Sequence, residues 1–277
     1  MMEEMLKAFP FADVYVDDVI IGSTGATRQE ALENHYKQVC QVLEKFEEMN
    51  LVARLGKSSF FVPEVEFCGQ ILSGGKKRPT PGKLKAIQEW EQPKTLKELR
   101  GFLGVCNYYG QYVKDLSKTA SDLQDLLKVP KGKTKSSSAR VLKWTPEAEK
   151  SFEETKKAML QKLELFVMHP DRPFILNTDA SDYAIGSTLN QIDEDGSKTG
   201  IKGKMYPVAF FSRKLAGAQR NWSPREKECY AIVASLHKWS SWIGLQPVDV
   251  LTDHKSLENW YSELVDTPSG PSGRRGR

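Results

Sequence analysis

Blocks of hydrophobic and polar positions along the chain predict a mixture of strands and helices. Apolar residues on both sides of two acids in FADVYVDDVIIGS (11–23) predict a β-hairpin. A capping box from Thr27 to Glu30 then opens a predicted helix. One face of this helix carries the apolar residues Leu32, Tyr36, Val39, Leu43 and Phe46. The stretch SSFFVPEVEFCGQILS (58–73) predicts two short strands broken at Pro63, because proline cannot donate a ladder hydrogen bond.

The loop SGGKKRPTPG (73–82) separates this part from a helical one. The helical part contains TLKELRGFLGVCNYYGQYV (95–113), which opens with a capping box from Thr95 to Glu98. Tyr108 and Tyr109 follow the helical apolar spacing, so we expect them in the core rather than stacked on a ligand. The low-complexity basic stretch that ends at Lys143 predicts a linker and a domain boundary.

The second half of the chain alternates between strand-like and helical segments. A helix is predicted from Pro146, with Thr145 as its N-cap. A second helix is predicted from Pro224, with Ser223 and Glu226 as its capping box. The remaining segments are three strand-like stretches and one strand that leads into a helix: 173–179, 183–191, 206–212 and 248–261. The order β-β-β-α-β-α predicts a mixed sheet with helices packed on it, and therefore an α/β fold.

Composition describes an ordinary globular protein, with 39% hydrophobic and 27% charged residues among 277. No stretch is long enough to cross a bilayer, so we expect no membrane partner. The N-terminus MMEEMLKAF lacks the basic-then-apolar pattern of a secretory signal, so we expect an intracellular protein. The four cysteines are scattered without a C-x-x-C pair, which argues against a zinc site and a disulfide framework.

The net charge of +4 conceals an uneven distribution along the chain. Residues 1–72 contain 6 Lys/Arg and 12 Asp/Glu, whereas residues 73–143 contain 16 Lys/Arg and 6 Asp/Glu. Residues 144–277 are balanced, with 18 of each sign. A basic middle segment can follow a phosphate backbone, but it can equally be a well-solvated helical surface.

Three acids of the second half occupy positions where a metal site can form. Asp179 ends one predicted strand, Asp253 ends another, and Glu228 lies one turn into the long helix. Sites in open α/β sheets gather outside strand ends, where these three carboxylates can converge. Oxygen ligands without His or Cys suit Mg²⁺ or Mn²⁺. Two such ions, roughly 3.5–4 Å apart, are the arrangement that promotes phosphoryl displacement.

Each of these acids also has a purely structural explanation. Asp179 can cap the following turn, Glu228 can form a surface ion pair, and Asp253 can cap the next helix. Glu226 competes with Glu228 for the metal role, but its place in the capping box leaves Glu228 free to point at the sheet. Spacing alone does not separate the metal site from these alternatives.

The predicted hairpin poses a separate question, because its tip carries the adjacent acids Asp17 and Asp18. Hairpin turns favour Asn-Gly or Asp-Gly, since these residues accept positive φ. Two neighbouring carboxylates repel each other and do not help the turn. The pattern therefore indicates a requirement other than folding.

Several motifs, in order, give the chain a resemblance to the reverse transcriptase and RNase H part of gypsy-like long-terminal-repeat retrotransposons. YVDD (15–18) resembles the polymerase palm motif, and GKSSFFVPEVEFCGQILS (56–73) resembles the segment that leads to the primer-holding strands. FLGVCNYY (102–109) is similar to the thumb signature. The nuclease segments are matched by FILNTDASDYAIGSTLNQ, PVAFFSRKL, REKECYAI and LTDHKSL. Any one motif is weak evidence, but their shared order is specific.

The resemblance implies roles at the matching positions. Asp17 and Asp18 would be paired metal acids of the polymerase, which explains why two carboxylates share the hairpin tip. Asp179, Glu228 and Asp253 would be the metal ligands of the nuclease, with Mg²⁺ or Mn²⁺ as cofactor. The implied partner is an RNA/DNA hybrid or a primer–template nucleic acid. Two neighbours of these acids, Ser181 and His254, are further candidates for contact with the substrate, although His254 also has a structural explanation at a helix start.

The resemblance also implies a domain organisation and an overall fold class. The fold class is α/β: an α+β palm and thumb fragment, followed by an RNase H-like mixed β-sheet with flanking helices. The expected parts are a C-terminal palm with the YVDD hairpin (1–80), thumb-like helices (81–128), a basic linker (129–143), a connection helix with a truncated RNase H-like domain (144–266) and a flexible basic tail (267–277).

Two departures from the family pattern shape the functional expectation. A polymerase needs a further palm aspartate from an upstream motif and the fingers. Both precede the part of the family pattern that this chain matches, so we expect no DNA synthesis by this chain alone. The nuclease pattern includes a fourth acid in a final helix, but no Asp or Glu follows Asp266, so we expect impaired cleavage.

The sequence is compatible with three hypotheses about function. The first is an enzyme fragment whose parent makes DNA from RNA and hydrolyses the template RNA. The second is a non-catalytic remnant that binds nucleic acid through the basic segment. The third is a defective product that folds poorly, because an incomplete sheet leaves an open edge.

Overall fold

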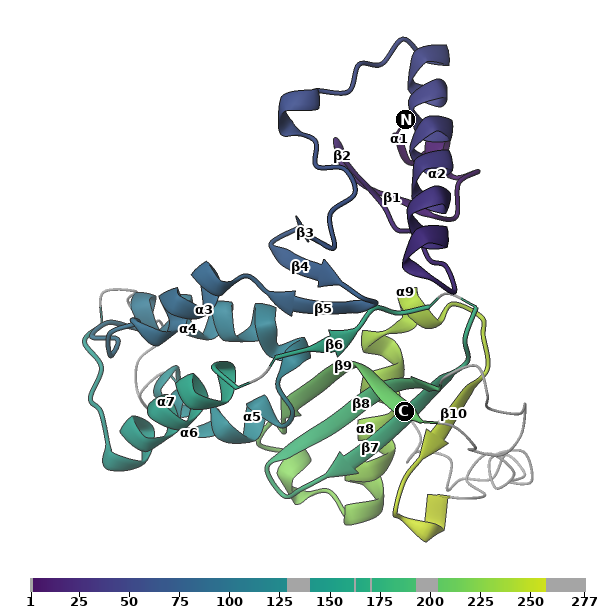
Figure 1. Ribbon diagram of the computed structural model, residues 1–277. Helices are drawn as coiled ribbons and strands as arrows, with labels where there is room; N and C mark the ends of the chain where they lie inside the picture. The colour runs from purple at the N-terminus through teal and green to yellow at the C-terminus, as the bar shows by residue number, and fades with distance from the viewer. Residues whose placement is uncertain (1, 129–139, 162, 170, 193–203, 258–277) are drawn as a thin grey trace. The chain divides into compact units, whose positions relative to one another are not determined.

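The computed structural model describes residues 2–128, 140–161, 163–169, 171–192 and 204–257 (Figure 1). The chain divides into two compact units, Met1–Thr80 and Pro81–Arg277, which are described separately below. Among the described residues, no helix combines the length and hydropathy needed to span a membrane.

The first unit begins with a tight hairpin held against two helices. Its elements are α1 (Met2–Leu6), β1 (Ala12–Tyr15), β2 (Asp18–Ile21) and α2 (Arg28–Glu48). β1 and β2 pair antiparallel with Tyr15 opposite Asp18, so the connecting loop is Val16–Asp17. The predicted hairpin is confirmed, but its tip is not the pair of acids, because Asp18 already belongs to β2.

Helix α2 begins as the capping box predicts. Thr27 Oγ1 accepts a hydrogen bond from the Glu30 N–H at 3.2 Å, while the Glu30 carboxylate binds the N–H of Ala26 instead of Thr27. The predicted apolar face is only partly a core face. Val39 is buried, whereas the exposed fractions of Leu32, Tyr36 and Leu43 are 37%, 62% and 38%. The described core of this unit contacts mainly the C-terminal half of α2, through Val42 and Phe46.

A three-stranded antiparallel meander follows a short 3₁₀ turn, η1 (Leu55–Lys57). Its strands are β3 (Glu64–Phe67), β4 (Gln70–Ser73) and β5 (Lys76–Pro79). The prediction of a break at Pro63 is wrong, because both strands lie after this proline and turn at Cys68–Gly69. Cys68 and Gly69 both have positive φ (50° and 72°), which is the type I′ pattern. The next turn, Gly74–Gly75, has the same pattern, so part of the predicted loop forms β5.

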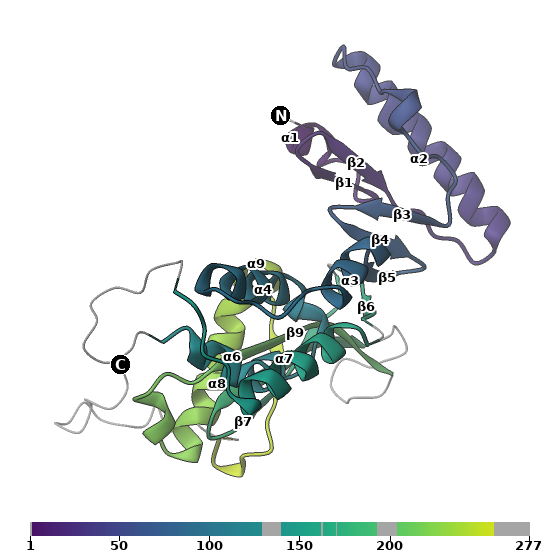
Figure 2. The same ribbon diagram turned by 90° about the vertical axis from the view of Figure 1, so that its left-hand side faces the viewer.

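The second unit begins with a cluster of helices, of which α4, α6 and α7 lie side by side (Figures 1 and 2). Its helices are α3 (Pro81–Gln88), α4 (Leu96–Tyr109), η2 (Gly110–Tyr112), α5 (Leu116–Thr119), α6 (Ser121–Leu126) and α7 (Pro146–Met159). Phe102 of α4 is fully buried, with its ring centroid 4.8 Å from that of Phe152 on α7. Tyr109 is buried too, but Tyr108 is 56% exposed, so the core prediction is wrong for Tyr108.

The predicted basic linker falls largely outside the described residues. Its last residues are described, and they are bound to the helical cluster. The Leu96 N–H donates to the Arg140 carbonyl and the Leu142 N–H donates to the Lys94 carbonyl, both at 2.9 Å. This end of the stretch is therefore a short paired segment rather than a free connection.

A four-stranded mixed sheet forms the rest of the second unit, in the order β10-β7-β8-β9. The strands are β7 (Phe174–Ala180), β8 (Ala184–Ile192), β9 (Met205–Lys214) and β10 (Val248–Leu251). β10 is parallel to β7, and the other neighbours are antiparallel, as the α/β prediction requires. The remaining elements are β6 (Leu165–Phe166), η3 (Gln219–Asn221), α8 (Pro224–Lys238), α9 (Ser240–Ile243) and η4 (Lys255–Leu257). β6 was not predicted, and the helix predicted from Pro224 ends at Lys238, before the separate short helix α9.

The two faces of the sheet carry different helices. Ser187 of β8 faces α8, because its Oγ lies 2.7 Å from Ser235 Oγ. Neighbouring residues of a strand point to opposite faces, so Gly186 faces the other way. There Asp115, in the loop before α5, lies so close that a Cβ on Gly186 would be 2.8 Å from its Oδ1. Helix α8 therefore covers one face, and the segment around α5 covers the other.

Candidate active-site carboxylates

Asp179 and Asp253 lie at the matching ends of two parallel strands. Asn177 of β7 is paired with Leu251 of β10, and each aspartate follows its paired residue by two positions. Both aspartates are exposed. Since parallel neighbours lie about 4.8 Å apart, this register brings the two residues to one edge of the sheet.

Glu228 reaches the same edge from helix α8. The complete capping box of Ser223 and Glu226 fixes the start of the helix, so Glu228 turns towards the sheet. Its Oε1 accepts a hydrogen bond from the Ala180 N–H at 3.0 Å. Its Oε2 is buried and, among the described residues, has no hydrogen-bond partner. Glu228 is only 6% exposed, which excludes the alternative of a surface ion pair.

The electrostatics of Glu228 connect the three acids. Burial raises the pKa of the Glu228 carboxyl, and the hydrogen bond from the Ala180 N–H opposes this shift. The negative charges of Asp179 and Asp253 raise the pKa further, whereas His254 lowers it. Negative charge therefore accumulates at the sheet edge, around a buried oxygen that has no hydrogen-bond partner among the described residues.

This arrangement fits a divalent cation chemically. The donors are carboxylate oxygens, as Mg²⁺ and Mn²⁺ prefer, and a cation would pair Glu228 Oε2 and offset the like charges. In the part of the chain that the structure describes, however, no three His, Cys, Asp or Glu side chains already form a ligand set. The prediction that the fourth acid and the final helix are missing falls on the end of the chain, residues 258–277, which lies outside the described residues.

Two further residues lie at this edge and were not among the predicted site residues: Asp182, in the connection between β7 and β8, and Lys227, on α8. Lys227, 5% exposed, places its Nζ 2.7 Å from Asp182 Oδ1. Ser181, a candidate for substrate contact, instead holds the turn: its Oγ accepts from the N–H groups of Tyr183 and Ala184. Ser181, rather than Asp179, therefore caps this turn.

Asp17 and Asp18 lie in the first unit, at the β1–β2 turn. Asp17 is the second loop residue, Asp18 is the first residue of β2, and both side chains are exposed. Val16, the first loop residue, has φ 60°. Positive φ at the first of two loop residues is the type II′ pattern, which normally requires glycine. A β-branched residue in this conformation is strained, and such strain is concentrated at functional sites.

A third acid and a thiol lie beside this hairpin. Asp13 of β1 is the diagonal neighbour of Asp18 on the same face, because the Tyr15–Asp18 pair is followed by the Asp13–Ile20 pair. Burial raises the pKa of the Cys68 thiol, and the charges of Asp18 and Asp13 raise it further. The period-2 alternation of the strand was the signal that could have identified Asp13.

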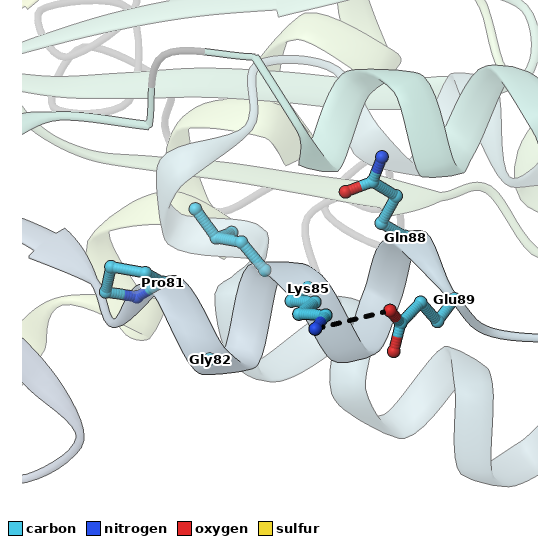
Figure 3. Close-up of a pocket in the computed structure, with 6 residues that line it drawn as sticks. Pro81, Gly82, Lys85, Gln88 and Glu89 are labelled. Atoms are coloured by element: carbon cyan, nitrogen blue, oxygen red, sulfur yellow. Dashed lines mark ion pairs between the residues drawn. The ribbon is translucent and has the colours of Figure 1, made fainter.

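A hollow of about 770 Å³ lies elsewhere in the second unit, along α3 (Figure 3). Its lining includes Pro81, Leu84 and Gln88, together with Lys85 and Glu89, whose charged atoms are 3.7 Å apart. It lacks the converging carboxylates of the sheet edge, so we do not take it as the active site.

Comparison with known proteins agrees with this architecture. Residues 144–250 match the family model of the RNase H-like domain found in reverse transcriptase. The chain is 33% identical over 245 residues to the Transposon Tf2-3 polyprotein of Schizosaccharomyces pombe (strain 972 / ATCC 24843), and 32% identical to the Tf2-7 polyprotein. Each alignment covers 88% of this chain, which spans only 17% of the length of these curated relatives.

Solved structures share the fold. The foamy viral protease-reverse transcriptase dRH in complex with ds DNA has a TM-score of 0.76 at 23% identity, over 96% of this chain and 46% of that one. The foamy viral protease-reverse transcriptase in complex with RNA/DNA hybrid has a TM-score of 0.72 at 23% identity, over 97% and 34% of the two chains. The domain match, the transposon relatives and the shared fold agree with one another. Together they support a retroelement segment of the reverse transcriptase and RNase H type.

Proposed function

We propose that the second unit is an RNase H-type endonuclease that hydrolyses the RNA strand of an RNA/DNA hybrid. The observation that carries this proposal is Glu228 Oε2, which is buried and has no hydrogen-bond partner among the described residues, on a carboxyl whose pKa the charges of Asp179 and Asp253 raise. A buried Glu228 carboxyl whose pKa is raised beside two like charges is costly to keep without a cation. This cost is a reason to assign them to catalysis rather than to folding.

In this proposal Asp179, Glu228 and Asp253 hold Mg²⁺ or Mn²⁺. The ion, when bound, supplies charge that activates a water molecule and stabilises the leaving 3′-oxygen. The chain itself provides the positions of the carboxylates, with Glu228 fixed by the Ala180 N–H. Selection of RNA would rest on contacts to the 2′-hydroxyl.

The first unit contributes to RNA-directed DNA synthesis by the intact protein in this proposal. Asp17 and Asp18 would be metal-binding acids of the nucleotidyltransferase site, at a turn that the pairing of Tyr15 with Asp18 closes and that is strained at Val16. That this chain alone makes no DNA remains a prediction, which primer extension on an RNA template tests directly. The intracellular location also remains a prediction.

The proposed partner is an RNA/DNA hybrid or a primer–template duplex. Support comes from solved neighbours that are described in complex with dsDNA and with RNA/DNA hybrid. Support also comes from the basic residues of the helical cluster. Exposed basic side chains on α3 and α4 include Lys83, Lys85, Lys97 and Arg100.

These exposed cations favour a second candidate function, a non-catalytic module that binds nucleic acid. Such a module would bind through phosphates, so its affinity would fall steeply with added salt. Both functions include binding, and they differ only in turnover.

The deciding experiment is Mg²⁺-dependent cleavage of a labelled RNA/DNA hybrid by the chain. An Asp179→Asn variant and an RNA/RNA duplex serve as controls. Cleavage of the hybrid alone, lost in the variant, supports the nuclease. Salt-sensitive binding of the hybrid by both proteins, without cleavage by either, supports the binding module instead.

A further inference from the structure

A buried lysine lies directly beside the candidate metal ligand Glu228. Lysine is almost never buried unless it is paired. Lys227 is 5% exposed, and its Nζ lies 2.7 Å from Oδ1 of Asp182, whose side chain is 83% exposed. The buried Lys227 side chain is therefore held by the packing around it. The exposed Asp182 side chain is not, and its ion pair with Lys227 fixes its position.

Two consecutive residues of α8 thus hold the same turn. Lys227 binds Asp182, and Glu228 binds the N–H of Ala180. Ala180 and Asp182 lie one and three positions after Asp179. The first turn of α8 therefore determines where the end of β7 lies relative to Glu228.

The turn does not need Lys227 for its own conformation. The Ser181 N–H donates to the Ala184 carbonyl at 2.9 Å, and Ser181 Oγ donates to the same carbonyl, also at 2.9 Å. The internal geometry of the turn is therefore closed without the ion pair. What the ion pair adds is the orientation of the turn against α8.

We propose that Lys227 and Asp182 form a clasp that sets the spacing between Asp179 and Glu228 for a divalent cation. This inference rests on the proposed nuclease function. Lys227 is a positioning residue, because it acts through Asp182 and the turn and not on the substrate. Groups that orient metal ligands typically change metal affinity by about 10–100-fold when they are removed.

The test combines hydrogen–deuterium exchange with Mn²⁺ titration of the full chain. The variants are Lys227→Met, Asp182→Asn, their double variant and the conservative Lys227→Arg. Lys238→Met, an exposed lysine in the last turn of α8, is the matched control. Asp182→Asn changes an exposed side chain, so it remains informative if Lys227→Met does not fold.

Faster exchange of the Ala180 amide, which donates to Glu228 across the contact between the turn and α8, is expected in Lys227→Met and in Asp182→Asn, but not in the control. Both variants are expected to bind Mn²⁺ about 10–100-fold more weakly. The double variant is expected to lose no more than either single one, because both changes remove the same contact. Lys227→Arg should recover most of the affinity, since it retains the charge.

Unchanged amide exchange in Asp182→Asn would overturn the clasp, whatever the metal result. Faster exchange with wild-type Mn²⁺ affinity would overturn its role in spacing the ligands. A wild-type chain that neither binds Mn²⁺ nor cleaves hybrid would refute the proposed nuclease and, with it, the metal-spacing role, while the exchange result alone would still decide whether the clasp forms.

Discussion

Replacing Val16 with glycine should stabilise the β1–β2 hairpin. Val16 has φ 60° in a two-residue turn, a conformation that costs a non-glycine residue about 1–2 kcal/mol. Glycine removes this cost but adds roughly 0.5–1 kcal/mol of backbone entropy to the unfolded state. Val16 is 73% exposed, so little burial is lost. The expected net gain in the free energy of unfolding is about 0.5–1 kcal/mol.

The assay must report on the first unit alone. All six tryptophans lie beyond residue 80, so tryptophan fluorescence reports on the second unit. Hydrogen–deuterium exchange in increasing urea, read on peptides covering residues 11–22, follows the hairpin directly. With a denaturant slope of about 1–3 kcal/mol/M, the expected gain moves the midpoint upward by about 0.2–1 M urea.

Val52→Gly is the matched control for this prediction. Val52 is 94% exposed and is not among the described residues with positive φ, so glycine there brings the entropy cost without relief of strain. Its midpoint should fall by an amount that corresponds to roughly 0.5–1 kcal/mol. If Val16→Gly lowers the midpoint as Val52→Gly does, the strain argument is refuted.

Three further predictions test the turns, the core and the buried acid. Cys68→Asn should stabilise the β3–β4 turn by about 1 kcal/mol, measured by exchange in that hairpin, because Asn-Gly suits a type I′ turn. Phe102→Ala should lower the free energy of unfolding of the second unit by about 3–5 kcal/mol in urea titrations followed by tryptophan fluorescence, whereas exposed Tyr108→Ala should change it by less than about 0.5 kcal/mol. Without divalent ions, Glu228→Gln should gain stability relative to wild type as the pH rises from 4.5 through the raised pKa of Glu228, because the folded wild type binds that proton more tightly than the unfolded chain does. Equal pH dependence of the two urea midpoints would contradict the raised pKa.

Local signals in the sequence identified most elements correctly. The capping residues Thr27, Thr95, Thr145 and Ser223 mark helix starts as predicted, because a cap depends on residues within one turn. The strands of the mixed sheet follow their apolar runs for the same reason. Where two local signals compete, the prediction is wrong: Pro63 predicts a strand break, whereas the turn forms at Cys68 and Gly69, which have positive φ.

Burial was harder to predict, because it depends on packing between distant segments. Tyr108 and Tyr109 share the same apolar pattern, yet only Tyr109 points into the core. Leu32 and Leu43 follow the periodicity of α2 but lie beyond the reach of its described core. Periodicity gives the face of a helix, but not how much of that face a neighbour covers.

The candidate acids show the same division between local and distant information. Strand ends and helix spacing predict a metal site formed by Asp179, Glu228 and Asp253, and the roles of these acids remain predictions. Lys227 could not be distinguished from the many surface lysines, because its burial follows from how the turn after β7 packs against α8. Asp13 was passed over because the family motif begins two residues later.

The packing of the helical cluster limits where the chain can be truncated or recombined without exposing its core. The family match begins at residue 144, but Phe152 and Met159 of α7 share one hydrophobic cluster with Ile87 and Leu99. A protein trimmed to residues 144–250 would expose the apolar side of α7 to water, and such exposed apolar surface promotes aggregation. Recombination that exchanged RNase H-like domains between elements would therefore have to transfer the preceding helices as well. The segment that folds as a unit is longer than residues 144–250, which the family model matches.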